Sequence, residues 1–75
     1  MYTPNELKTM AALEGFKQSS PLEKLVYFER IVHKSTLREI GILIGASYQT
    51  ASRLCKAVED RILLRFEILS KKYKV

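Results

Sequence analysis

Residues 37–54 read LREIGILIGASYQTASRL, and this stretch predicts two helices joined by a glycine turn. Apolar residues recur before the turn with the spacing of one buried helix face, at Leu37, Ile40, Leu43 and Ile44. Gly45 follows, and glycine enters the left-handed conformation that turns a chain sharply without a steric cost. Ser47 is a suitable N-cap for the second helix, because its hydroxyl accepts a hydrogen bond from a free backbone N–H.

The helix after the turn is predicted to be apolar on one side and polar on the other. Ala51, Leu54 and Val58 form the apolar side. Residues 48–53 include no acid, whereas an average exposed helix mixes both signs of charge. A helix that lies in the major groove of DNA presents side chains at these offsets to base edges. We therefore expect base contacts from Tyr48, Gln49, Ser52, Arg53 and Lys56.

Gly41 lies inside the first helix of this pair, where glycine costs about 1 kcal/mol relative to alanine, so we expect it to permit a close approach of the following helix. With TLREIG at residues 36–41 and GASYQTASRL at residues 45–54, the segment resembles the helix-turn-helix of bacterial DNA-binding proteins. It is most similar to the −35-reading, region 4-like domain of sigma factors, over residues 20–62. The resemblance implies a helix-turn-helix at about residues 36–56.

In such a motif the first helix crosses the DNA backbone. Phosphate contacts are expected from Lys34, Thr36, Arg38, Ser47 and Thr50. For Tyr48, a phosphate and a thymine methyl group are both open as partners. The resemblance to sigma factors implies that an acid at Glu39 orients a basic neighbour.

The net charge of +5 is concentrated in the second half of the chain. Residues 1–30 hold four basic and four acidic side chains, whereas residues 53–75 hold seven basic and three acidic ones. Such an excess of positive charge is typical of a protein that binds phosphates. The three lysines at positions 71, 72 and 74 have a second interpretation, as a solvated helix end that complements the helix dipole.

The length predicts one domain, residues 1–75. Cys55 is the only cysteine and His33 the only histidine, so we expect neither a disulfide framework nor a metal site. The two residues fall on different predicted helices with no third group to orient the imidazole, so we expect no enzymatic activity and no cofactor. Apolar runs are too short to span a membrane and a signal-peptide pattern is missing, which favours a cytoplasmic protein.

An all-α fold, a compact domain of four helices, is predicted, because strand patterns are missing from the sequence. Thr3-Pro4-Asn5-Glu6 and Ser20-Pro21-Leu22-Glu23 each combine an N-cap hydroxyl, a proline and a glutamate, which marks two helix starts. We expect Gly15 to end the first helix, and either Ser35 or Thr36 to cap the third.

The fourth helix is predicted to start at Ser47 or Tyr48 and to run for about 25 residues, since it meets no glycine or proline. Its far end is apolar around most of its circumference, and a second copy of the chain is the simplest cover for such a helix. The expected dimer interface comprises Val58, Ile62, Phe66, Leu69 and Tyr73. In the alternative arrangement, the first helix folds back over this end and leaves a monomer.

These patterns predict a sequence-specific, double-stranded DNA-binding transcription regulator that acts as a homodimer. The alternative is a stand-alone sigma-like domain whose main partner is RNA polymerase, bound by the apolar end of the last helix. A third possibility is an adaptor that uses the scaffold only to bind protein, and the basic second half of the chain argues against it.

Overall fold

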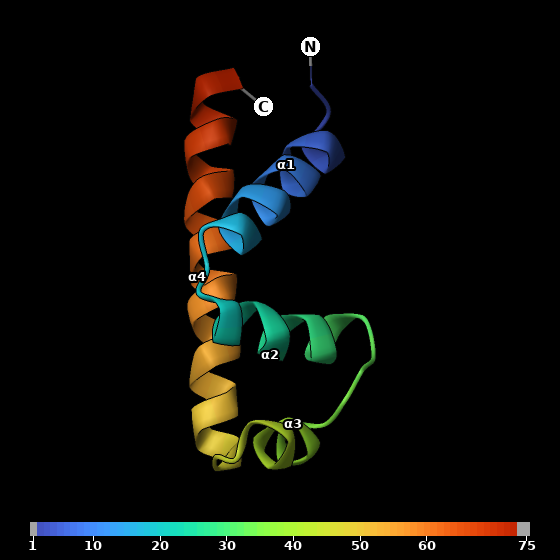
Figure 1. Cartoon of the computed structure of the whole chain (residues 1–75). Coiled ribbons are helices and arrows are strands. Elements are labelled where there is room, and N and C mark those ends of the chain that lie inside the picture. The colour runs from blue at the N-terminus through green and yellow to red at the C-terminus, as the bar shows by residue number, and fades with distance from the viewer. Residues whose placement is uncertain (1, 74–75) are drawn as a thin grey trace.

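The computed structural model describes residues 2–73, which form four helices (Figure 1). These are α1 (Pro4–Lys17), α2 (Pro21–Ile31), α3 (Leu37–Ile44) and α4 (Tyr48–Tyr73). The predicted all-α class is confirmed, and α4, with 26 residues, is the expected long C-terminal helix. Among residues 2–73, none of the helices combines the length and apolar character that crossing a membrane requires.

Capping boxes fix the starts of the first three helices. In each box the hydroxyl of the N-cap residue accepts a hydrogen bond from the backbone N–H three residues on, and the glutamate there accepts one from the N-cap N–H. The pairs are Thr3 with Glu6, Ser20 with Glu23, and Thr36 with Glu39. The sequence predicted the first two boxes. The third shows that the carboxylate of Glu39 caps α3, where the resemblance to sigma factors had implied that it orients a basic side chain.

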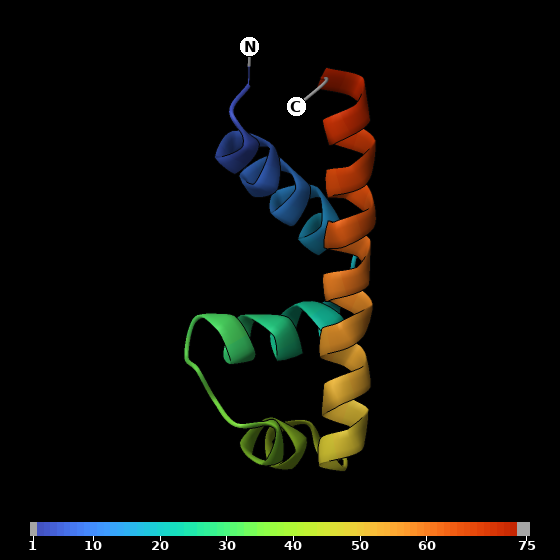
Figure 2. The same cartoon turned by 180° about the vertical axis from the view of Figure 1, so that it is seen from behind.

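The three short helices all pack against α4, and they lie on the same side of it (Figures 1 and 2). α2, α3 and the first half of α4 enclose one apolar core, which comprises Val26, Ile40, Ala51 and Cys55. α1 packs on the second half of α4 around Leu7, Ala11 and Leu69. Because the two cores follow one another along α4, the molecule is elongated, with extents of 43 × 17 × 17 Å.

Gly15 lies inside α1 and does not end it, contrary to the prediction; α1 continues to Lys17. A Cβ atom at Gly15 would lie 2.6 Å from Cγ1 of Ile62 and 3.0 Å from the Ile62 backbone nitrogen. These distances are shorter than packed atoms tolerate, so the missing side chain lets α1 cross α4 at close range. The reason for this glycine is a contact 47 positions away in the chain, which local sequence patterns do not reveal.

Of the two glycines of residues 37–54, Gly45 has the predicted role and Gly41 has it in part. Gly45 caps α3 in the left-handed conformation, with φ 70° and ψ 34°. A Cβ atom at Gly41 would lie 2.7 Å from the carbonyl oxygen of Ala46, so a side chain there would collide with the turn. Gly41 therefore permits a close approach, but the atoms that approach it belong to Ala46 and Ser47 of the turn and not, as we had predicted, to the following helix.

Most of the predicted dimer interface is covered by α1 within the same chain, and all of it is at least half-buried. Val58 and Leu69 are 0% and 4% exposed, so a second chain cannot reach them and this part of the prediction is wrong. The other three predicted interface residues, Ile62, Phe66 and Tyr73, pack around the core that α1 forms with α4. The observed arrangement is thus the alternative in which the first helix folds back over the end of the last.

Large apolar side chains remain exposed on two other surfaces. One is the groove between α1 and α2, lined by Ala12, Leu13, Phe16, Tyr27, Phe28, Ile31 and Val32. The other is the second half of α4, where Leu63, Leu64 and Ile68 are exposed. Exposed apolar patches of this kind are typical of interaction surfaces.

Candidate nucleic-acid interface

The five predicted base-contact residues lie on the exposed side of the first three turns of α4. Their side chains all have substantial solvent exposure, while Ala51 and Cys55 on the opposite side are buried. The 3.6-residue period of a helix brings these positions onto one side. The five residues are Tyr48, Gln49, Ser52, Arg53 and Lys56. The structure therefore presents the predicted set together, as one polar surface.

The N-terminus of α4 differs from those of the other helices. Ser47 accepts a hydrogen bond from the backbone N–H of Thr50 over 3.3 Å, and its hydroxyl also contacts the Thr50 hydroxyl. Thr50 occupies the position that holds a capping glutamate in the other three helices. Because the first turn of α4 holds no acid, the positive end of its dipole is not compensated by a side chain there.

Arg38 is the predicted phosphate contact that the fold brings next to this surface. Its guanidinium group lies 5.9 Å from the centre of the Tyr48 ring. Arg38 is at the start of α3 and Tyr48 is at the start of α4, so the contact joins these two helix ends. A cation over an aromatic ring is attracted by the electrons of the ring face. This contact holds a positive charge beside the first turn of α4 while both side chains stay exposed.

Two other predicted phosphate contacts, Thr36 and Lys34, differ from Arg38 in their placement. Thr36 is exposed, but its hydroxyl accepts a hydrogen bond from the Glu39 backbone N–H as part of the α3 cap. Lys34 belongs to the loop between α2 and α3, which lies on the side of the molecule remote from α4 in both views (Figures 1 and 2). The backbone of Lys34 is left-handed, with φ 55°, an uncommon conformation for a lysine. Lys34 is thus separated from the polar surface of α4.

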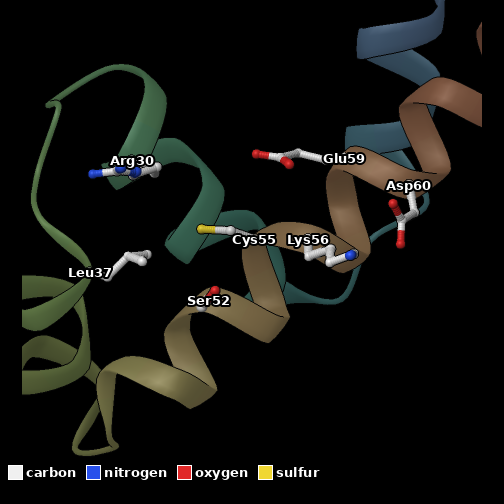
Figure 3. A pocket seen from close by; sticks show the side chains of 7 residues that line it. All are labelled: Arg30, Leu37, Ser52, Cys55, Lys56, Glu59 and Asp60. Atoms are coloured by element: carbon white, nitrogen blue, oxygen red, sulfur yellow. The ribbon is translucent and has the colours of Figure 1, made fainter.

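A hollow beside Ser52 and Lys56 adds a residue that the sequence analysis missed. Arg30 of α2 forms its far wall, and Cys55 lies between the two helices (Figure 3). A guanidinium nitrogen of Arg30 donates a hydrogen bond to the Ser35 carbonyl oxygen over 2.9 Å, which ties α2 to the loop that follows it. The sequence offers no sign of this placement, because Arg30 precedes Ser52 by 22 positions.

Two acids limit the positive surface of α4. Glu59 and Asp60 line the same hollow as Lys56 and lie about one helical turn after it along α4 (Figure 3). Burial raises the pKa of the Cys55 thiol, and the carboxylate of Glu59 raises it further. The basic surface therefore ends near Lys56, after about three turns of α4.

The basic excess of residues 53–75 is not a single surface. Arg61 forms an ion pair with Glu23, and Arg65 forms one with Glu14, so two of its seven cations are neutralised by the first half of the chain. Lys71 follows Arg53 by 18 positions, which corresponds to roughly 27 Å along a helix. Only Arg53 and Lys56 of this segment lie on the candidate interface, and Lys74 is outside the described residues.

Comparisons of the chain with protein-family models, with curated proteins and with solved structures find no match. The interpretation of its function therefore depends on the residues described above.

Proposed function

We propose that this protein binds double-stranded DNA in a sequence-specific manner and regulates transcription, with the start of α4 in the major groove. The observation that carries the proposal is the surface formed by Tyr48, Gln49, Ser52, Arg53 and Lys56, together with Arg38. This surface is polar or basic throughout, exposed, and mounted on a helix whose opposite side is fixed in a core. A rigid helix with these side chains meets the geometric need of base readout.

The chemistry of each group suggests its role in the complex. A glutamine pairs with adenine through two hydrogen bonds, and an arginine pairs with guanine in the same way, so Gln49 and Arg53 supply sequence recognition. Arg38 and the backbone N–H groups at the start of α4 supply phosphate contacts, which set the position of the helix in the groove. Glu59 and Asp60 repel phosphates, so they orient α4 with its first turns toward the duplex.

The salt dependence of DNA binding tests this proposal. Four cations lie on the helix-turn-helix side of the molecule: Arg30, Arg38, Arg53 and Lys56. If each neutralises one phosphate, the logarithm of the association constant falls against the logarithm of salt concentration with a slope of about −4. Fluorescence anisotropy of a labelled duplex at about 50–200 mM salt measures this slope.

A matched pair of double variants locates the binding surface. Arg38→Ala with Arg53→Ala removes two charges at the proposed interface, and we expect the slope to become shallower by about 2. Lys71→Ala with Lys72→Ala removes two charges at the far end of α4, and we expect the slope to stay unchanged. Equal changes in both variants would show that binding is not centred on the start of α4. Absence of binding at low salt would exclude the proposal.

Docking on another protein, as in a sigma-like domain that binds RNA polymerase, is the second candidate function. The observation that favours it is the apolar groove between α1 and α2, where Leu13 is 66% exposed. In this case, Leu13→Glu and Ile31→Glu weaken binding to RNA polymerase and leave binding to duplex DNA unchanged. Copurification with the polymerase, compared between these variants and the natural chain, distinguishes the two functions.

A further inference from the structure

The groove between α1 and α2 is apolar along its walls and stays open in the folded chain. Its lining side chains are aliphatic or aromatic, and among them Ile31 and Val32 are 52% and 56% exposed. A contiguous exposed patch of this kind is typical of an interaction surface. The groove has a volume of about 200 Å³, below the roughly 300–1,000 Å³ of small-molecule sites. Its size therefore suits a few side chains of another protein better than a free small ligand.

We infer that this groove binds an amphipathic helix of another protein, one with large apolar side chains on one side and acidic side chains beside them. The inference extends the second candidate function, docking on another protein, by stating the chemistry of the partner. It depends on that function and is independent of DNA binding.

The lining of the groove explains why the partner is helical. The backbone N–H and C=O groups of α1 and α2 are used within these helices, and the side chains that line the groove are aliphatic or aromatic. A segment buried there must therefore pair its own backbone groups. A helix does so, and its apolar side chains at positions i, i+3, i+4 and i+7 fill such grooves.

Two lysines lie one helical turn from residues of the groove. Lys17 follows Leu13 by four positions on α1, which places the two on one side of that helix. Lys24 precedes Phe28 by four positions on α2 in the same way. The Nζ atom of Lys24 lies 6.0 Å from the centre of the Phe16 ring, which itself lines the groove. Neither lysine forms an ion pair with another residue of the part of the chain that the structure describes.

The acids of α1 and α2 are held within the chain, and none of them lines the groove. Two form ion pairs with arginines of α4, one caps the start of α1 and one contacts the imidazole of His33; in this order they are Glu14, Glu23, Glu6 and Glu29. The charges beside the groove that await a partner are thus the two lysines, and they are complementary to an acidic helix. A second copy docked groove to groove would instead bring the lysines of both chains together.

Fluorescence anisotropy with two designed peptides tests the inference in the absence of DNA. One labelled peptide of about 18 residues carries leucines at helical spacing and glutamates beside them, and the other has lysines in place of the glutamates. We expect the glutamate peptide to bind at least about tenfold more tightly than the lysine peptide. Leu13→Glu with Ile31→Glu lowers the affinity for the glutamate peptide at least about tenfold. Helicity by circular dichroism is unchanged in this variant, because both side chains are exposed.

A charge reversal tests the role of the two lysines. In Lys17→Glu with Lys24→Glu, we expect the preference to invert, so that the lysine peptide binds more tightly than the glutamate peptide. Lys71→Glu with Lys72→Glu is the matched control, since it makes the same change of charge at the far end of α4. This control binds both peptides as the natural chain does.

Failure of the glutamate peptide to bind at up to about 1 mM overturns the inference. Equal binding of the two peptides also overturns it, as does binding that survives Leu13→Glu with Ile31→Glu. Binding of duplex DNA is measured without peptide, so loss of peptide binding with duplex binding intact rejects the acidic partner alone. Copurification with RNA polymerase that Lys17→Glu with Lys24→Glu leaves unchanged would retain docking on a protein and reject the acidic partner.

Discussion

The Nη1 atom of Arg61 lies 2.8 Å from Oε1 of Glu23, and this ion pair connects α4 to the start of α2. The same guanidinium nitrogen donates a hydrogen bond to the hydroxyl of Ser19 over 3.2 Å, and Ser19 in turn donates to the Gly15 carbonyl oxygen. Glu23 also accepts a hydrogen bond from the backbone N–H of Ser20, where α2 begins. The Glu23 carboxylate therefore caps α2 and binds Arg61 of α4, and Arg61 continues the network to α1 through Ser19.

This arrangement makes the stability of the protein sensitive to acid. The Arg61 guanidinium, and next the Ser20 backbone N–H, lower the pKa of Glu23 from 4.5 to about 2. Because the folded pKa lies below the unfolded one, the stabilisation is complete above pH 4.5 and is lost as the pH falls toward 2. We expect Glu23→Gln to lower the melting temperature at neutral pH, and the melting temperatures of variant and natural chain to converge as the pH approaches 2.

Thermal unfolding followed by circular dichroism over this pH range measures the difference. Glu67→Gln, at an exposed position of α4, serves as the control. A difference between Glu23→Gln and the natural chain that does not change with pH would show that the ion pair with Arg61 is not the cause.

The glycines of the turn predict two distinct responses to substitution. A side chain at Gly45 would be strained only by the positive φ, since a Cβ there meets nothing within 4 Å. Gly45→Ala should therefore lower the free energy of unfolding by about 1–2 kcal/mol, and Gly45→Asn by less, because asparagine tolerates the left-handed conformation. At Gly41 a Cβ collides with the Ala46 carbonyl oxygen, so Gly41→Ala and Gly41→Asn should both destabilise. Urea denaturation of the four variants gives these values.

Local patterns explain why the helices and their starts could be predicted from the sequence. Prolines, N-cap hydroxyls and the glycine at position 45 act within a few residues, so their effects are readable in the chain itself. The role of Gly15, by contrast, depends on its contact with Ile62, and the cover over Phe66 depends on where α1 lies. Such contacts between distant residues leave no periodic signal along the chain.

The candidate interface shows the same division. Residues on consecutive turns of one helix, such as Gln49 and Arg53, share a side by the helical period, so their grouping was predictable. The placement of Arg30 beside Ser52 and Lys56 depends on how α2 packs, and that of Lys34 depends on the loop that follows α2, so neither could be read from the sequence. The number of charges in each segment likewise could not predict that Arg61 and Arg65 are neutralised by acids of α2 and α1.

The placement of α1 over α4 predicts a large difference between two leucines. Leu69 is 4% exposed in the core that α1 forms with α4, whereas Leu13 is 66% exposed in the groove. Leu69→Ala should cost about 2–5 kcal/mol, because it removes buried contacts and leaves a cavity. Leu13→Ala should change the free energy of unfolding by about 0.5 kcal/mol or less. Chemical denaturation at low protein concentration compares them, and equal losses would mean that α1 does not cover this end of α4.

The last prediction separates residues that read bases from those that position the helix. Arg53→Ala and Gln49→Ala each remove a side chain able to form two hydrogen bonds with a base, so each should cost about 1–3 kcal/mol on the preferred sequence and much less on random duplex. Arg38→Ala should weaken binding to both duplexes by a similar factor, because phosphates are the same in every sequence.

A preferred duplex for this comparison comes from selection of random sequences by the natural chain. Lys72→Ala serves as the control, since it removes a charge at the far end of α4, away from the proposed interface. If Arg53→Ala, Gln49→Ala and Arg38→Ala all lose the same affinity on every duplex, α4 contacts only the backbone of DNA. Sequence recognition would then have to come from a different surface, and the basic start of α4 would serve as a general phosphate-binding element.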